Sequence, residues 1–160
     1  MPDTDNSTLI RTFYEAFARR DAEAMAACYH DDVQFSDPVF RDLRGVHAGN
    51  MWRMLCGRAA DLKVEASAIA ADGVAGSAHW EAWYTFSATG RKVHNKIDAR
   101  FRFQDGKIIE HLDTFPLWKW TRMALGPAGT LLGWTPLVKG KLRSEAAKGL
   151  AEFEQDLGSA

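Results

Sequence analysis

The sequence is poor in cysteine and contains no long apolar run. Its two cysteines, Cys28 and Cys56, show no C-x-x-C spacing, so neither a disulfide framework nor a cysteine-based metal site is expected. No stretch approaches the roughly 18–20 apolar residues that a membrane-spanning helix needs. The first residues, MPDTDNSTLIRTF, are polar and acidic, unlike a signal peptide. We therefore expect a cytoplasmic protein without membrane association.

An excess of charge of one sign is also lacking. The formal net charge is −1 and no run of Lys or Arg occurs, which argues against a nucleic-acid partner. No phosphate-cradling glycine loop, dinucleotide fingerprint or Ser-His-Asp constellation is present, so we expect no cofactor. The 160 residues, 46% of them hydrophobic, suit one globular domain with one core.

The period of the apolar residues changes near residue 61. Before it, helical spacing predicts three helices and one intervening short strand, over 8–20, 22–29, 47–59 and 33–37. After it, alternating segments predict a four-strand antiparallel meander, with hairpin signals at 72–73, 89–90 and 105–106. Helices followed by strands indicate an α+β fold in which the helices pack on one face of a curved antiparallel sheet.

The C-terminal part of the chain differs in composition from the rest. A short apolar helix or turn follows residue 117, and Gly and Pro punctuate the next residues. Residues 138–155 form an amphipathic pattern, with Leu142, Ala146 and Leu150 along one stripe. We predict a main domain over 1–117 and a helical extension over 118–160, packed on that domain or on the partner of a dimer.

Ionisable residues line up across the predicted strands. If the last two hairpins have two-residue loops, Glu81 faces Asp98 and Asp98 faces Asp113, with His79 in the adjacent row on the same face. Inside a closed cavity one of these acids would stay protonated near neutral pH, as general acid–base catalysis requires. On a solvated face they would be ordinary surface charges. A β-bulge in any strand would undo the row.

Two long segments carry a resemblance to a known family. FYEAFARRDAEAMAACYHDDVQFSDPVF, followed by a helix and a meander that ends FRFQDGKIIEHLDTF, resembles the nuclear-transport-factor-2-like (NTF2-like) superfamily. The SnoaL-like and ketosteroid-isomerase-like branches are the most similar, over roughly residues 8–117. The resemblance implies a cone-shaped α+β barrel with a pocket between the helices and the concave sheet. It also implies a homodimer formed through the sheet.

The resemblance to steroid isomerases points to two acids. Their base is an acid followed by proline at the end of the first strand, which falls on Asp37 in FSDPVF. Their second acid, which donates a hydrogen bond to the developing oxyanion, falls on Asp98 in KIDARFRF. Their tyrosine on the first helix falls on Phe13, with Tyr14 one position further along.

Two other branches point to the last strand. The acid/base of SnoaL-type cyclases matches Asp113 in EHLDTF. Limonene-epoxide-hydrolase-like proteins combine such an acid with an Arg and an acid on the middle strand. Here Glu81 matches that acid and His79 stands in place of the Arg. Each of these active sites is therefore matched in part.

Three functions stay open from the sequence. The favoured one is an enzyme that moves a proton next to a carbonyl of a small apolar molecule, as an isomerase or cyclase does. The others are a dimeric binding module for an apolar metabolite and an epoxide-hydrolase-like enzyme. His79, Glu81, His111 and Asp113 could hold a metal, but charged pairs are a commoner use of such residues, so we expect none. The predicted substrate-binding residues are Tyr14, Phe17, Met54, Trp83, Phe115 and Trp118.

Overall fold

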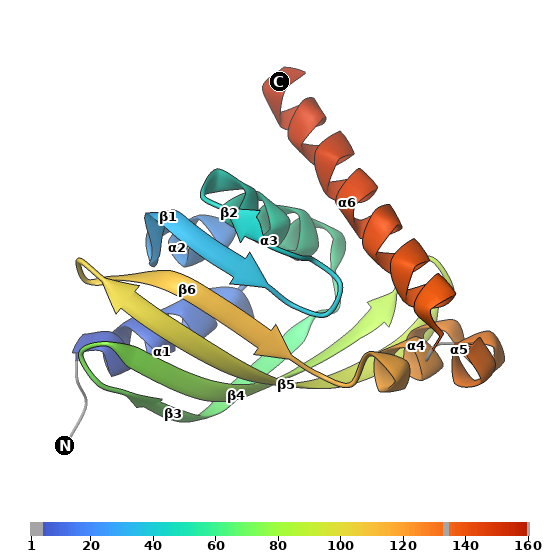
Figure 1. Cartoon of the computed structure of the whole chain (residues 1–160), viewed down its shortest axis with the longest axis horizontal. Coiled ribbons are helices and arrows are strands. Elements are labelled where there is room, and N and C mark those ends of the chain that lie inside the picture. Colours follow the sequence, from blue (N-terminus) through green and yellow to red (C-terminus); the bar gives the residue numbers. More distant parts are fainter. Residues whose placement is uncertain (1–4, 133–134, 160) are drawn as a thin grey trace.

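The computed structural model describes residues 5–132 and 135–159, so the predicted ranges 1–117 and 118–160 each include residues outside this description. The helices are α1 (Asp5–Ala18), α2 (Ala22–Ala27), α3 (Val46–Arg58), α4 (Leu117–Leu125), α5 (Pro127–Leu132) and α6 (Pro136–Ser159). The strands are β1 (Tyr29–Ser36), β2 (Leu43–Arg44), β3 (Lys63–Ala71), β4 (Ala75–Phe86), β5 (Arg91–Gln104) and β6 (Lys107–Thr114). Figure 1 shows α1, α2 and α3 on one side of a curved sheet and α6 running past α3.

The N-terminal helices form where the apolar period predicts them. In α1, Ile10, Phe13 and Phe17 are buried, so the helix packs one apolar stripe on the sheet. Asp21 caps α2, because its Oδ1 accepts a hydrogen bond from the backbone N–H of Ala24 at 3.1 Å. The two predicted N-terminal helices are therefore confirmed.

The sheet has the order β2-β1-β6-β5-β4-β3 and is not closed into a barrel. All neighbours pair antiparallel except β1 and β6, which are parallel. Since α3 and four strands separate β1 from β6 in the chain, the chain has room to return in the same direction. The α+β class with helices on a curved sheet is confirmed, with one parallel pair in place of the wholly antiparallel sheet predicted.

Only one of the two hairpin loops used to predict the register has the expected length. Asp105 and Gly106 form a two-residue loop, and both have positive φ, as a type I′ turn requires. The β4–β5 loop has four residues, because Phe86 pairs with Arg91. This difference moves the pairing by two residues, so Glu81 faces Lys96 and His79 faces Asp98.

A bulge in β6 corrects the predicted row of acids. Arg102 pairs with Glu110 while Phe103 pairs with Ile108, which leaves Ile109 as an extra residue in β6. Beyond such a bulge every side chain of the strand changes face relative to the regular register. Asp113 therefore faces the helices, whereas Asp98, beside Thr114, faces away from them. The prediction that Glu81, Asp98 and Asp113 form one row is wrong.

The two faces of the sheet are consequently distinct. The inner face, toward the helices, carries buried side chains from three strands: Trp80 and Ala82 of β4, Asn95, Ile97, Ala99 and Phe101 of β5, and His111 and Asp113 of β6. The outer face carries the exposed Lys96, Asp98, Arg100 and Arg102 of β5. The core lies between the inner face and the helices.

Replacing the central aromatic of α1 should cost much of the stability. Phe13 is fully buried and packs against Tyr29, Trp52 and His111, with ring centroids 5.4–5.8 Å away. We expect Phe13→Ala to lower the free energy of unfolding by about 3–5 kcal/mol, because it leaves a cavity in the core. Urea unfolding measures the loss. Thr12→Ala, at the adjacent exposed position, should stay within about 0.5 kcal/mol of the parent, and equal losses would contradict the packing described.

Candidate functional site

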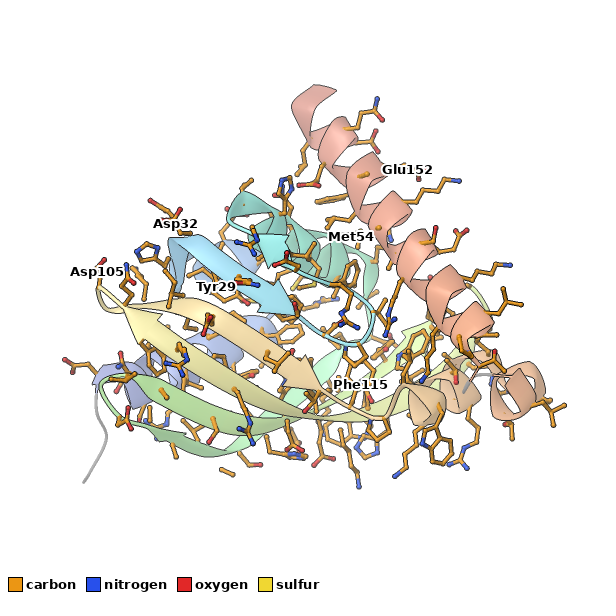
Figure 2. All side chains as sticks on the ribbon, viewed as in Figure 1. Tyr29, Asp32, Met54, Asp105, Phe115 and Glu152 are labelled. Carbon is orange, nitrogen blue, oxygen red and sulfur yellow. The ribbon has the colours of Figure 1, made fainter. Side chains whose placement is uncertain are left out.

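A cavity of about 440 Å³ lies between α3, the inner face of the sheet and the C-terminal helices. Its lining is mostly apolar and rich in aromatic rings, which suits an apolar ligand. The aromatic lining residues are Phe17, Phe40, Trp52, Trp80, Tyr84, Phe86, Phe115 and Trp120. Figure 2 labels Met54 on α3 and Phe115 after β6, two residues that line the cavity from different elements.

Three residues with a carboxyl group line this cavity: Asp37, Asp113 and the exposed Glu145 of α6. Asp113 lies on β6 and is 2% exposed. Its Oδ1 accepts a hydrogen bond from the indole N–H of Trp80 at 3.3 Å, and the Nε2 of His111 lies 2.9 Å from the same oxygen. Asp113 is thus held by two groups of the inner face, one from β4 and one from its own strand.

A buried hydrogen-bond chain continues behind Asp113. The Nδ1 of His111 lies 2.8 Å from the hydroxyl of Tyr29, and that hydroxyl accepts a hydrogen bond from the indole N–H of Trp52 at 2.8 Å. All four side chains are buried. The chain therefore links α3, β1 and β6 to one carboxylate at the cavity, and the polar side-chain atoms of His111, Tyr29 and Trp52 all have partners.

Asp37 performs a structural task and also lines the cavity. It follows β1, and its Oδ1 accepts the backbone N–H groups of Val39 at 2.7 Å and Phe40 at 2.6 Å, which closes the loop after the strand. Burial raises the pKa of Asp37 to about 7, and the nearby Asp113 adds to the rise, although the two backbone bonds lower it.

Two further polar groups face the cavity without a full set of partners. The side chain of Asn95, on β5, belongs to a residue 8% exposed and makes no hydrogen bond with the described part of the chain. The hydroxyl of Tyr84, on β4, accepts a hydrogen bond from the indole N–H of Trp120 at 2.7 Å. Burial raises the pKa of Tyr84, so this hydroxyl keeps its proton and can donate a hydrogen bond to a ligand.

The structure brings five of the predicted site residues to this cavity. They are Asp37 and Asp113 among the acids, and Phe17, Met54 and Phe115 among the predicted substrate-binding residues. Phe17 comes from α1, Met54 from α3 and Phe115 from the segment after β6. Elements that are distant in the sequence thus meet around Asp37 and Asp113.

Three predicted catalytic residues lie on the outer face instead. His79 contacts Asp98 through Nδ1 at 3.0 Å and Glu81 through Nε2 at 3.1 Å, and the Asp98 side chain is 78% exposed. The hydrogen bond to Asp98 is the main reason that the pKa of His79 is raised. Glu81 also accepts a bond from His94, which lowers its pKa. The prediction that these residues share a pocket with Asp113 is wrong because of the β6 bulge.

The remaining predicted binding residues also lie outside the cavity lining. Trp83 is on the outer face, stacked on His94 with ring centroids 4.4 Å apart. Trp118 is 45% exposed beneath the cationic groups of Lys119 and Arg122. Tyr14 is buried in the core, and its hydroxyl has no hydrogen-bond partner among the described residues. Burial raises the pKa of Tyr14 as well.

Sequence reasoning missed His111 as a partner of Asp113. It placed His111 beside the acids, but not as the group that contacts one of them. Residues two apart in a strand share a face whatever the register, so the spacing of His111 and Asp113 was a usable signal. The contributions of Tyr84 and Asn95 had no comparable signal, because they depend on the pairing register. The stripe with Leu142 and Ala146 indicated a packed face of the C-terminal helix, but not that this face lines the cavity.

Some expectations concern other kinds of site. In residues 5–132 and 135–159, no group of three or more His, Cys, Asp or Glu side chains is arranged to hold a metal ion. Within the same residues, no helix is both long and apolar enough to cross a bilayer. The outer face has a hollow of about 820 Å³, whose lining includes Arg100, Arg102 and Leu112. Dimerisation through this face and a cytoplasmic location stay predictions.

Comparison with known proteins agrees with this architecture. Residues 10–111 match the SnoaL-like domain family. Among proteins with curated descriptions, none matches the sequence. Solved structures do match. An NTF2-like protein of unknown function from Burkholderia pseudomallei is 21% identical, with a TM-score of 0.65, over 76% of this chain and 98% of that one.

Two further structures differ from each other in their described activities. A candidate SnoaL-like polyketide cyclase from Jannaschia is 13% identical, with a TM-score of 0.69, over 79% of this chain and 96% of that one. An epoxide hydrolase similar to limonene epoxide hydrolase, from M. tuberculosis, is 20% identical, with a TM-score of 0.64, over 82% and 97%. At these identities the likeness shows the shared fold, and the family is shown by the match over residues 10–111. The chain belongs to the SnoaL-like domain family.

Proposed function

We propose that the protein is an enzyme that moves a proton next to a carbonyl group of a small apolar molecule. Asp113 acts as the base, and protonated Asp37 donates a hydrogen bond to the carbonyl oxygen. One observation carries this proposal: both carboxyl groups line the same aromatic cavity, in different environments. Pairs of acids whose surroundings favour different protonation states are how such sites divide acid and base roles.

The hydrogen-bond chain behind Asp113 suits a base. The Tyr29 hydroxyl accepts from Trp52, so its own proton is free for Nδ1 of His111. His111 then carries its proton on Nε2, and this N–H donates a hydrogen bond to Asp113. The indole N–H of Trp80 donates a second hydrogen bond to Asp113. Both bonds are donated toward one oxygen, the arrangement that an ionised carboxylate accepts. The second oxygen is left to take a proton from a ligand.

Asp37 suits the opposite role. With a pKa of about 7, a substantial share of its carboxyl groups keeps a proton at neutral pH. A protonated carboxyl can donate a hydrogen bond to an oxygen that gains negative charge during the reaction. Its other oxygen stays bound to the backbone of Val39 and Phe40, which holds the group in place.

The proposed reaction has two proton transfers. The Asp113 carboxylate takes the proton from the carbon next to the carbonyl, and the electron pair of that C–H bond forms an enolate. Asp37 stabilises the enolate oxygen through its hydrogen bond. In an isomerisation, protonated Asp113 then returns the proton to another carbon of the same molecule. In a ring closure, the enolate carbon attacks a second carbonyl, and the proton passes to the new oxygen.

Two alternatives use the same cavity. A binding module would hold an apolar metabolite without moving a proton, and the apolar lining suits that role equally well. Epoxide hydrolysis, which one structural relative is described as carrying out, would use Asp113 to activate water. The hydrolase mechanism that uses Glu81 and His79 as partners of Asp113 does not fit, because both residues lie on the outer face of the sheet. Proton transfer is therefore the function that the geometry favours.

The base can be tested without knowing the natural substrate. 5-Nitrobenzisoxazole is an uncharged aromatic compound that releases a coloured phenolate when a base removes one proton. We expect the wild-type protein to accelerate this reaction and Asp113→Asn to lower kcat/KM at least about 100-fold, the size of a general-base contribution. Absorbance at 380 nm measures the rate.

The matched control for this experiment is Asp98→Asn. Asp98 lies on the outer face, so its replacement should change kcat/KM less than about twofold, as expected for a group outside the cavity. Equal rates for Asp113→Asn and the wild-type protein, including the absence of any acceleration, would rule out the proposed base. Binding of an apolar probe without acceleration would then favour the binding module.

Asp37 should make stability depend on pH. A carboxyl whose pKa rises from 3.8 to about 7 on folding binds more protons in the folded than in the unfolded state between those values. Stability should therefore fall as the pH rises from about 4 to about 7 and level off above that, by roughly 2–4 kcal/mol relative to Asp37→Asn. Urea unfolding of both proteins from about pH 4 to about pH 8, values spanning this window, measures the difference.

The Asn substitution suits this comparison, because its side-chain oxygen can still accept the backbone bonds from Val39 and Phe40. Asp32→Asn, at an exposed position on β1, serves as the control and should follow the wild-type curve. If the wild-type protein and Asp37→Asn differ by the same amount at every pH, Asp37 does not titrate near neutrality and cannot be the proposed donor.

A further inference from the structure

The segment after β6 contributes to the cavity although it lies beyond residues 10–111, which define the family match. It supplies Trp120 from α4, and it supplies Leu142, Glu145, Ala146 and Gly149 from α6. These positions follow one another at helical spacing, so one side of α6 forms the outer wall of the cavity. The cavity is therefore lined partly by residues that lie beyond the family domain.

Three contacts hold α6 in this position. The Nε of Arg143 donates a hydrogen bond to the backbone oxygen of Pro38 at 3.0 Å, next to Asp37. Further along, Glu154 accepts hydrogen bonds from His47 at 2.5 Å and from Asn50 at 2.7 Å, both on α3. Between these anchors Leu150 is buried in the core. The helix is thus attached both to α3 and to the loop that presents Asp37.

A fourth contact links α4 to the polar side of the cavity. The indole N–H of Trp120 donates a hydrogen bond to the Tyr84 hydroxyl. The O–H of Tyr84 must therefore donate its own hydrogen bond to another acceptor. No acceptor for that proton is found among the described residues, and Tyr84 lines the cavity. Asn95 is a second lining residue with an unpartnered polar side chain. A ligand oxygen is the acceptor that this arrangement fits.

We propose that α4 and α6 are working parts of the ligand site: α6 limits the size of the ligand, and Trp120 aims the Tyr84 hydroxyl at a ligand oxygen. The ligand class is then a ring-bearing apolar molecule with a carbonyl group, which deepens and rests on the function proposed above. Trp120 acts through Tyr84 and is a positioning residue.

The role of α6 as a wall of the cavity can be tested by placing a larger side chain on it. N-phenyl-1-naphthylamine is a neutral aromatic probe whose fluorescence rises in apolar surroundings. We expect the wild-type protein to bind it, and Ala146→Phe to weaken binding at least about tenfold, because the new ring occupies the cavity. Ala147→Phe is the matched control, since Ala147 is the next residue and is exposed. It should bind the probe as the wild-type protein does.

Two outcomes would overturn the role of α6. One is equal probe affinity for Ala146→Phe and Ala147→Phe, and the other is no binding by the wild-type protein. Unfolding curves of both variants show whether Ala146→Phe is folded. If it is not, Glu154→Gln, which weakens an anchor of α6, replaces it, with the exposed Glu152→Gln as its control (Figure 2). The proposal then requires weaker probe binding by Glu154→Gln alone.

The role of Trp120 can be tested with two ligands of nearly equal shape. 2-Acetylnaphthalene carries a carbonyl oxygen that 2-ethylnaphthalene lacks, and each can displace the probe. We expect the wild-type protein to prefer the ketone by about three- to tenfold, the value of one hydrogen bond. Tyr84→Phe and Trp120→Phe should each remove the preference, and the double variant should lose no more than Tyr84→Phe.

Trp118→Phe is the control, because Trp118 is exposed on the same helix and should keep the preference. A wild-type protein without the preference, or Trp120→Phe with it intact, would overturn the role of Trp120. These experiments measure binding only, so they can succeed where the test of Asp113 as a base fails. That combination would leave a binding module whose site α4 and α6 complete.

Discussion

The position of Asp113 depends on one irregularity in the sheet, the extra residue Ile109 in β6. Without it, the regular register would turn Asp113 to the outer face and bring Leu112 to the inner one. With it, His111 and Asp113 both enter the interior, where Trp80 and His111 bond to one oxygen of Asp113, Tyr29 bonds to His111, and Trp52 bonds to Tyr29. A buried carboxylate needs such partners, so the bulge and the hydrogen-bond chain support each other.

Asp37 and Asp113 line the same cavity but have different surroundings. Asp113 receives side-chain donors in the interior, whereas Asp37 lies in a loop and takes backbone donors while burial favours its protonated form. The contrast arises because the two carboxyls reach the cavity from different elements, β6 and the segment after β1. Loops after strands are common places for such groups, since they can present a side chain that a rigid scaffold orients.

The C-terminal helices add a layer that the curved sheet does not provide. The sheet is open, so its inner face needs covering where α1, α2 and α3 do not reach. α6 lies beside α3 and bonds to the loop that carries Asp37, which links the cover of the cavity to one of its acids (Figure 1). The hydrogen bond from Arg143 to Pro38 therefore connects the helix proposed to limit ligand size with the loop that carries Asp37.

The sequence by itself determined the α+β class, the helices of the first half and the presence of Asp37 and Asp113 among the candidate acids, because periodicity and turn residues are local signals. It could not determine which face each strand presents. A four-residue loop at 87–90 and an extra residue at Ile109 decide that, and neither leaves a distinct local pattern. Tertiary structure therefore removed His79, Glu81 and Asp98 from the site and added His111, Tyr84 and α6, because these placements depend on strand register and long-range packing.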